Sequence, residues 1–555
     1  MALIDALARM EAVAAGRARP LTTVRHRHLS PNPLVLVPLT TAGESGAPLG
    51  ALVGTDRDKP TLLTVNQPRD RDLRSAFLAE LADVVLPYVD AFAEDVEHLE
   101  RRETDPATGE RVTVAAELCR DAPQLVVPSA AGVEFVRLLG RSMRFRRTAE
   151  TDPEAAYPAP PRVPLLGRWL THFGERARVP GSCLLVAATG LLTRHWATGQ
   201  SVLEDQHLAS LLAWIDPPAG LSGARAAEEA ERSRDERGLL RCPPAGPATD
   251  PTFDSVVLAP AVARWDAGLP GAGEALRALL EGQLRPTWDA VWHALDLLGE
   301  LPEGAHVADR WQRDRWSYTA HRDRVRAGEP PQPRRDDAVT AAQKLATRES
   351  AHAQLDAQEA LDDPLVMAGR RMAGEALAGE VTAVEMAFSE GRRAMPRPLV
   401  SVRSRDEARW PAGTRLHRAL PDGRSQPAEV VAWENEPAAP GDEGVLVVRL
   451  TGGMGRGKTP EEGSVPSEGD RVCWTAFEHA PRGGPGLPAP EDTPWTHGGP
   501  PGDLPGPAAP AAAAGPAGHG GPAAGGAAGE AGPARPPAVT LPLEEPDPVT
   551  AEDFL

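Results

Sequence analysis

Leu165–Ile215 reads LLGRWLTHFGERARVPGSCLLVAATGLLTRHWATGQSVLEDQHLASLLAWI, and this stretch decides how the surrounding chain folds. It contains three tryptophans and a nearly unbroken apolar run from Cys183 to Leu192, with Pro180 and Gly181 as helix-ending residues. Such a segment must be buried on most sides. We therefore expect neighbouring helices to pack around it, as a central helical block over residues 160–300.

The charge balance limits the classes of partner. The chain has 555 residues and a formal net charge of −19. This argues against a general polyanion binder, because affinity for phosphate backbones comes from clustered cations. The four cysteines are isolated, residues 1–10 lack the basic start of a signal peptide, and the longest apolar run is too short to cross a bilayer. We therefore expect a cytoplasmic protein with free thiols and no membrane-spanning segment.

Residues 1–150 are expected to form a small mixed α/β unit. Three short apolar runs within residues 21–65, PLVLVPLT, GALVG and TLLTV, are separated by Pro, Gly and Asp, as strands of a small sheet would be. An amphipathic pattern predicts a helix over residues 72–100, with a kink at Pro87. A further strand-like run covers Leu125–Val127.

Long helices are expected over residues 301–395, after the helical block. Helical periodicity first covers Ala272–Gly299, and then predicts helices over Asp337–Leu361 and Pro364–Gly391. The proline at position 364 suits the first turn of the last helix. The apolar residues of that helix recur at three- and four-residue spacing: Leu377, Val381, Val384 and Phe388.

The pattern changes from helical to alternating at Pro396. Five β-like runs follow within residues 396–479, with Gly- or Pro-rich turns between them, which predicts a small β-barrel of the SH3 or OB kind. Residues 480–555 are dominated by Pro, Ala and Gly, and we expect this tail to be disordered because it has too little apolar surface to bury. The fold expected overall is multidomain and mainly α.

Gly452–Thr459 reads GGMGRGKT and matches the P-loop pattern G-x-x-x-x-G-K-[ST] in full. A P-loop also needs a helix that begins at its Lys-Thr end, because the helix amides hold the phosphates. Gly463 and Pro466 leave no room for such a helix. We therefore favour a solvated hairpin loop. Contact of Arg456 and Lys458 with a phosphate backbone or an acidic partner stays an alternative, as does a divergent P-loop nucleotide hydrolase.

Trp311–Arg335 interleaves arginines with aromatic residues, a combination that nucleic-acid surfaces use for phosphate contact and base stacking. Asp314 and Asp323 alternate with these arginines, so the same pattern also fits an ion-paired helix whose aromatics turn inward. The candidate nucleic-acid contacts are Arg310, Arg313, Arg315, Trp316 and Arg322.

The end of the tail differs from the rest of it. Val539–Leu555 mixes apolar with acidic residues, which is the composition of a short docking peptide. Its candidate docking residues are Leu541, Leu543, Phe554 and Leu555. No cofactor or metal is expected: His26 and His28 fall on one side of a strand, but the sequence offers no third ligand near them.

Leu399–Phe477 resembles the small β-barrels inserted in or attached to nucleic-acid-dependent ATPases, through its glycines and alternating apolar residues. The resemblance carries no site residues over. We therefore expect a non-catalytic adaptor that engages a protein partner through its barrel and tail, with a nucleic-acid-processing ATPase as a candidate partner. The alternatives are a nucleic-acid binder that uses residues 310–335 and the barrel loops, and a P-loop hydrolase at 452–459. The oligomeric state stays open.

Overall fold

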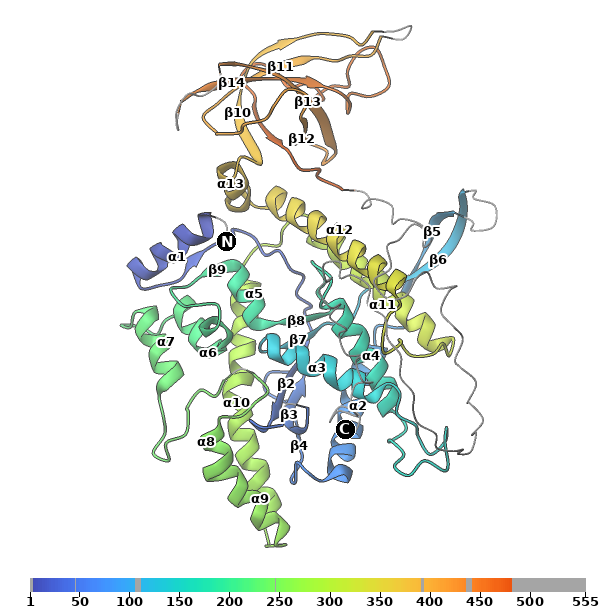
Figure 1. Ribbon diagram of the computed structural model, residues 1–555, viewed down its shortest axis with the longest axis vertical. Helices are drawn as coiled ribbons and strands as arrows, with labels where there is room; N and C mark the ends of the chain where they lie inside the picture. Colours follow the sequence, from blue (N-terminus) through green and yellow to red (C-terminus); the bar gives the residue numbers. More distant parts are fainter. Residues whose placement is uncertain are drawn as a thin grey trace, which may run out of the picture.

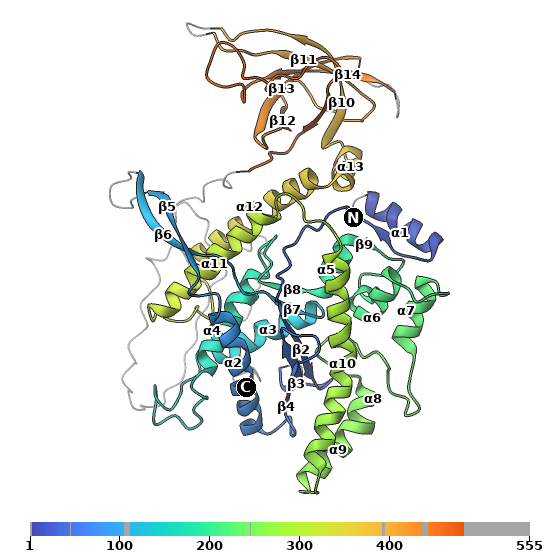
Figure 2. The ribbon, with the colours of Figure 1, turned by 180° about the vertical axis from the view of Figure 1, so that it is seen from behind.

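The computed structural model describes residues 3–44, 46–104, 111–244, 246–390, 394–435 and 442–481. Of these residues, 41% are helical and 21% lie in strands. The expectation of a mainly α protein was therefore too simple. Figures 1 and 2 show an α/β body, a small β-barrel at one end of the long axis, and a helical corner between them. From residue 482 onward, the tail lies outside the described residues.

A five-stranded mixed sheet lies at the centre of the body (Figure 1). Its strands run in the order β4, β3, β2, β7 and β8; the first three are antiparallel, β7 is parallel to β2, and β8 is parallel to β7. Every residue of β2 is buried, so both faces of the sheet are covered. The strands are β2 Leu34–Thr40, β3 Pro48–Gly54, β4 Thr61–Thr64, β7 Leu125–Val127 and β8 Leu185–Ala187.

Helices pack against this sheet from several directions. Helix α10 contacts β2, β3 and β4, helix α2 contacts β3 and β4, and helix α3 contacts β7 and β8. The helix predicted over Ala272–Gly299 is confirmed as α10. The helices of the body are α1 Leu3–Ala15, α2 Arg71–Asp90, α3 Ala130–Met143, α4 Val163–Arg176, α5 Ala188–His195, α6 Leu208–Ile215, α7 Gly223–Arg232, α8 Pro251–Phe253, α9 Ala259–Asp266, α10 Ala272–Gly299 and α11 Val307–Arg326. Shorter elements are a 3-10 turn at Glu204–Gln206, a π turn at Asp254–Leu258, and the paired strands β1 Arg19–Pro20 and β9 Trp196–Ala197.

The apolar run Cys183–Leu192 belongs to a strand and a helix. Leu185–Ala187 forms β8 at the edge of the sheet, and α5 begins directly after it at Ala188. A short buried strand and a buried helical turn share one apolar pattern, so periodicity could not separate them. The predicted helical block therefore contributes a strand to the sheet of the N-terminal unit. One hydrophobic cluster spans both, and the division at residues 150–160 stays a prediction.

Helix α2 is shorter than predicted. Asp70 caps its start by accepting hydrogen bonds from the Asp72 and Leu73 nitrogens, and the helix ends at Asp90 rather than near Glu100. The residues beyond it form a hairpin of β5 (Val96–Thr104) and β6 (Arg111–Cys119). Their apolar spacing continues that of the helix, but pairing between the two strands overrides this local pattern.

Helices α3 and α4 meet at a pair of glycines. A Cβ atom on Gly140 would lie 2.5 Å from the Thr171 nitrogen, and one on Gly167 would lie 2.4 Å from the Arg144 nitrogen. Both distances are shorter than real Cβ atoms show, so the two backbones can be this close only because neither position has a side chain. This contact fixes the path of α4, and with it the position of Arg176 at the end of that helix.

Helix α12 (Ala338–Asp362) lies alongside α11 and turns sharply into α13 (Pro364–Met372), as Figure 1 shows. The predicted helix Asp337–Leu361 is thus confirmed. Asp363 makes the corner: its backbone is extended and its side chain caps α13 by accepting from the Leu365 nitrogen. The proline at 364 occupies the first turn of α13, as predicted.

A closed six-stranded barrel follows α13, in the order β10, β11, β14, β13, β12 and β15, with β10 and β15 paired to close it. The small barrel expected from the sequence is therefore present, but with six strands instead of five. Its core includes Trp474 and Leu416, neither of which has exposed surface. The strands are β10 Ala376–Glu385, β11 Leu399–Ser404, β12 Arg415–Ala419, β13 Ser425–Asn435, β14 Gly444–Leu450 and β15 Arg471–Thr475.

The sixth strand, β10, comes from the segment predicted to be the end of a helix. That prediction was wrong beyond Met372, because Gly374 has a φ of +74° and ends the helix. Leu377 and Val381 are four residues apart, a spacing that puts them on one side of a strand as well as of a helix. A β-bulge after Val381 then shifts Val384 toward the barrel core. The apolar spacing was therefore ambiguous.

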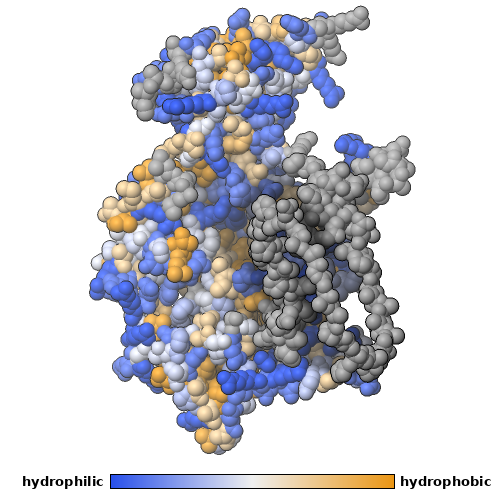
Figure 3. Space-filling view, in the orientation of Figure 1, coloured by the Kyte–Doolittle hydropathy of each residue, from blue (hydrophilic) through white to orange (hydrophobic). Residues whose placement is uncertain are grey.

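The barrel is joined to the body through a narrow neck (Figure 3). In the neck, Trp410 Nε1 donates to the Gly374 carbonyl at 3.0 Å, and the Ala476 nitrogen donates to the Glu375 carbonyl at 2.8 Å. Arg371 of α13 forms two hydrogen bonds with Asp406 of the barrel. Within the described residues, no helix combines the length and the apolar character that a membrane span needs.

We predict that Gly167→Ala destabilises the protein by about 1–3 kcal/mol, because the new methyl group must push α3 and α4 apart. The matched control is Gly282→Ala on α10, where a Cβ meets nothing within 4 Å; this change should leave stability the same or raise it by about 0.4–1 kcal/mol. Urea denaturation of both variants tests this, and equal midpoints would refute the close contact.

Candidate functional site

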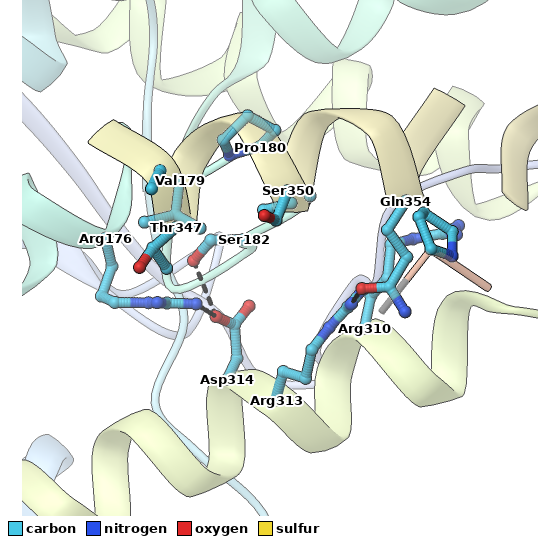
Figure 4. Close-up of a pocket in the computed structure, with 14 residues that line it drawn as sticks. Arg176, Val179, Pro180, Ser182, Arg310, Arg313, Asp314, Thr347, Ser350 and Gln354 are labelled. Atoms are coloured by element: carbon cyan, nitrogen blue, oxygen red, sulfur yellow. Dashed lines mark hydrogen bonds and ion pairs between the residues drawn. The ribbon is translucent and has the colours of Figure 1, made fainter. Parts of the chain in front are cut away.

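A cleft of about 480 Å³ lies between the turn after α4, helix α11 and the middle of α12 (Figure 4). Three arginines line it, Arg176 from α4 and Arg310 and Arg313 from α11. Hydroxyl and amide side chains of α12 line the opposite wall. The last described residue, Pro481, also lines the cleft. We call this feature the arginine cleft.

The turn after α4 brings the first of these arginines into place. The helix ends at Arg176, and the chain reverses at Gly181, whose φ of +86° is unfavourable for other residues. A Cβ atom at this glycine would also lie 3.2 Å from Cδ of Arg310, so the turn fits tightly against α11.

Asp314 holds this side of the cleft together. Its carboxylate accepts hydrogen bonds from Arg176 at 2.9 Å and from the Ser182 hydroxyl at 2.7 Å (Figure 4). It also accepts one from the Cys183 nitrogen at 2.6 Å. The residue has no exposed surface. A buried carboxylate is tolerated only when donors surround it. Asp314 therefore positions Arg176, and its oxygens are already occupied.

Arg313 lies on the other side of the cleft and joins α11 to α12. Its guanidinium group donates to the side-chain oxygens of Gln354 and Gln358. These partners are neutral, so its hydrogen bonds do not neutralise its charge, and the carboxylates that act on it are Asp314 and Asp309. Burial lowers the pKa of Arg313, but arginine stays protonated in proteins. Ser350 projects from α12 above Asp314, between the two arginine sides (Figure 4).

Helix α12 is held at one end only. Its buried residues all lie at or after Leu355, and its first half is largely exposed. At the buried end, Glu359 accepts hydrogen bonds from Arg27 at 2.9 Å and from Arg194 at 2.6 Å. Burial opposes ionisation of Glu359, but Arg194 and Arg27 outweigh it and lower the pKa to about 2.

The next two carboxylates of α12 complete this attachment. Asp362 pairs with His306 Nδ1 at 2.5 Å and lies 3.7 Å from Arg310. Asp363 accepts from the Thr23 hydroxyl and from the Thr23 and Val24 nitrogens. We call Glu359, Asp362 and Asp363 the carboxylate clamp, because they fix the corner from which both the cleft wall and the barrel extend.

The arrangement of the cleft suits anion binding rather than acid–base chemistry. Within the described residues, its lining includes no His, Cys or Lys, and its single carboxylate already has three donors. Arginine guanidinium groups bind carboxylates and phosphates through paired N–H donors. Val179, Pro180, Ala346 and Ala351 add apolar surface beside the charges.

The predicted nucleic-acid residues do not form one surface. Arg310 and Arg313 line the cleft, and the other three lie against the β5–β6 hairpin. Arg315 donates to the Cys119 carbonyl at 2.8 Å, and Arg101 of β5 lies over the ring of Trp316. Arg322 has 4% exposed surface and donates to the Ala93 carbonyl at 2.7 Å. These contacts fit the alternative of an ion-paired helix whose aromatic side chains turn inward. Nucleic-acid binding by these residues stays a prediction.

Arg456 and Lys458 are exposed in the loop between β14 and β15. No helix follows them: the described residues 451–470 consist of turns, bends and irregular backbone. Met454 is buried in the barrel core, and its carbonyl accepts from the Glu461 nitrogen at 3.0 Å. The loop thus closes back on the barrel, but the expected hairpin was wrong: β14 and β15 are not neighbours in the barrel, and the loop crosses from one to the other. Phosphate or partner contact through it stays a prediction.

The remaining candidates give no second site. Leu541, Leu543, Phe554 and Leu555 lie outside the described residues. Among the residues that the structure describes, no group of three His, Cys, Asp or Glu side chains could hold a metal ion. His26 is buried and stacks on His195, with ring centroids 6.1 Å apart.

Sequence reasoning missed Arg176, Ser350 and Gln354. The sequence did contain one indication of this site. Arg310 and Arg313 are three residues apart on one helix, and Gln354 and Gln358 are four residues apart on the next, so that arginine donors of the first can meet amide oxygens of the second. Comparisons of the chain with protein-family models, curated proteins and solved structures found no match. The fold and site define an α/β protein with a small barrel and a cleft lined by three arginines.

The contact between α4 and α11 depends on two neutral histidines. His172 and His321 stack with ring centroids 4.2 Å apart and planes within 7°. Both are buried, and Trp169 packs its edge against His321. Burial, with Arg324 and Arg168 nearby, lowers the pKa of His321 to about 3, and burial lowers the pKa of His172 well below its usual value.

We predict that acid weakens this contact. Because the folded pKa values lie below the unfolded value near 6.5, the unfolded chain binds more protons below that pH. The stabilising contribution is complete above pH 6.5, and for His321 it is lost as the pH falls toward 3. The free energy of unfolding should fall by about 1.4 kcal/mol per pH unit for each histidine.

Denaturation at pH 7.5 and pH 5 measures this slope. His321→Phe keeps a stacked ring without a titrating group. It should reduce the slope by the contribution of one histidine, about 1.4 kcal/mol per pH unit. An unchanged slope in this variant would show that the pair does not titrate with unfolding.

Proposed function

We propose that the protein is a non-catalytic adaptor that holds an acidic segment of a partner protein in the arginine cleft. One observation carries the proposal: Arg176 and Arg313 lie on opposite sides of a cleft in which the one lining carboxylate, Asp314, is already occupied by three donors. Incoming carboxylates therefore meet three guanidinium groups and a single lining carboxylate, which is paired with Arg176. The apolar lining residues suit aliphatic or aromatic side chains between the acidic ones.

A protein segment fits the molecule better than nucleic acid does. The formal net charge of −19 repels a polyanion at long range. Acidic residues also outnumber basic ones in the barrel, over residues 376–481. A short acidic peptide needs only the local charge of the cleft.

The barrel supplies a second surface for the same partner. It extends from the body on α13, and the segment after β10 exposes two large apolar side chains: Met386 is 47% exposed and Phe388 is 53% exposed. Exposed apolar residues on a small module are typical of a protein contact. The resemblance of the barrel to those of nucleic-acid-dependent ATPases makes such an enzyme the first partner to test.

We predict that the full-length protein binds a fluorescein-labelled synthetic peptide made only of Glu, Asp, Leu and Phe. Arg313→Glu should weaken this binding about tenfold or more, because it replaces a charged hydrogen-bond donor with a repelling carboxylate. Arg264→Glu is the matched control: it makes the same charge reversal at an exposed residue of α9, outside the cleft. Fluorescence anisotropy measures both, and equal losses in the two variants would contradict the cleft as the binding site.

A duplex DNA probe in the same assay tests the nucleic-acid alternative. Tight binding that falls steeply with salt and depends on Arg313 would replace the protein-partner proposal.

We also predict that Lys458→Ala leaves phosphate release from ATP by the purified protein at the level of the unmodified chain. The reason is that no helix follows the lysine to hold the phosphates. A hydrolysis activity that disappears in this variant would establish the P-loop alternative and refute the adaptor.

A further inference from the structure

The chain leaves the barrel at the arginine cleft. After β15, the Ala476 nitrogen donates to the Glu375 carbonyl, and His479 is buried with its Nε2 3.0 Å from the Thr475 hydroxyl. These contacts direct the exiting segment toward the body, where Pro481 lines the cleft. Everything that follows residue 481 is therefore tethered at the mouth of the proposed binding site.

The sequence of the tail contains a ligand of the required chemistry. Val539–Leu555 has five acidic residues and no Lys, Arg or His. Its apolar residues are interspersed with the acidic ones, which suits the mixed lining of the cleft. The acidic residues are Glu544, Glu545, Asp547, Glu552 and Asp553, and the apolar ones include Leu541, Leu543, Phe554 and Leu555.

The chain between the barrel and this segment is long enough for the segment to reach the cleft. Residues 482–538 have a contour length on the order of 190 Å at about 3.3 Å per residue, which is far more than the cleft requires. The outer wall also has room to adjust, because the first half of α12 carries no buried residue.

We propose that Val539–Leu555 docks in the arginine cleft of its own chain and competes there with the acidic segment of the partner. This inference rests on the proposed function, since it assigns a second occupant to the same site. Tethering favours the internal segment, because its effective concentration is set by the linker rather than by the solution. A partner must displace the segment, so the tail raises the concentration of partner that is needed for binding.

The test uses the full-length chain with a neutralised tail, in which Glu544→Gln, Glu545→Gln, Asp547→Asn, Glu552→Gln and Asp553→Asn are combined. This variant should bind the labelled acidic peptide at least about tenfold more tightly than the unmodified chain, because the internal competitor is lost. Amide exchange over residues 338–354 of α12 should become faster in the same variant. A labelled Val539–Leu555 peptide added to it should bind, and Arg313→Glu should abolish that binding.

The matched control replaces Glu491, Asp492 and Asp503, also in the tail, by amides and should change neither measurement. Equal affinity and equal exchange in the neutralised-tail variant and the unmodified chain would overturn the docking, while Arg313-dependent peptide binding would still support the adaptor. If no acidic peptide binds and Arg313→Glu has no effect, both proposals fail. If protection of the α12 amides from exchange rises with protein concentration, the tail docks between copies, and docking within one chain is refuted.

Discussion

The carboxylate clamp at the end of α12 is the constraint on which the rest of the arrangement depends. Glu359 and Asp363 are buried and the side chain of Asp362 has no exposed surface, and each carboxylate is satisfied by groups from distant parts of the chain, including Arg27, Arg194 and His306. Charges are buried only where such partners surround them. The clamp therefore fixes the direction of α12 over α11, which forms the cleft, and the direction of α13, which carries the barrel.

Much of the fold could be predicted from local pattern. Helix α10 and helix α12 were located almost to the residue, because their apolar positions keep helical spacing over many turns. The errors share one physical cause. In β8, β10 and β5, short apolar spacings fit helix and strand equally, and pairing with a distant strand decided the outcome.

The site was harder to predict than the fold. Arg310 and Arg313 were singled out from their sequence, but as part of a surface with Arg315 and Arg322, which instead hold the β5–β6 hairpin. A helix sequence shows which residues are charged, and it does not show which helix will lie alongside. Helix α12 directly follows α11 in the chain, but the turn at Gly181 is separated from α11 by several elements.

The closure of the barrel by its first and last strands has a consequence for how this protein is built. Ala376 is directly paired with Thr475, so the chain enters and leaves the barrel through neighbouring positions, about 5 Å apart. A unit with adjacent entry and exit can be exchanged as a cassette without disturbing the host fold. The body is thus suited to carry different barrels after α13, and each of them would return the chain to the same place.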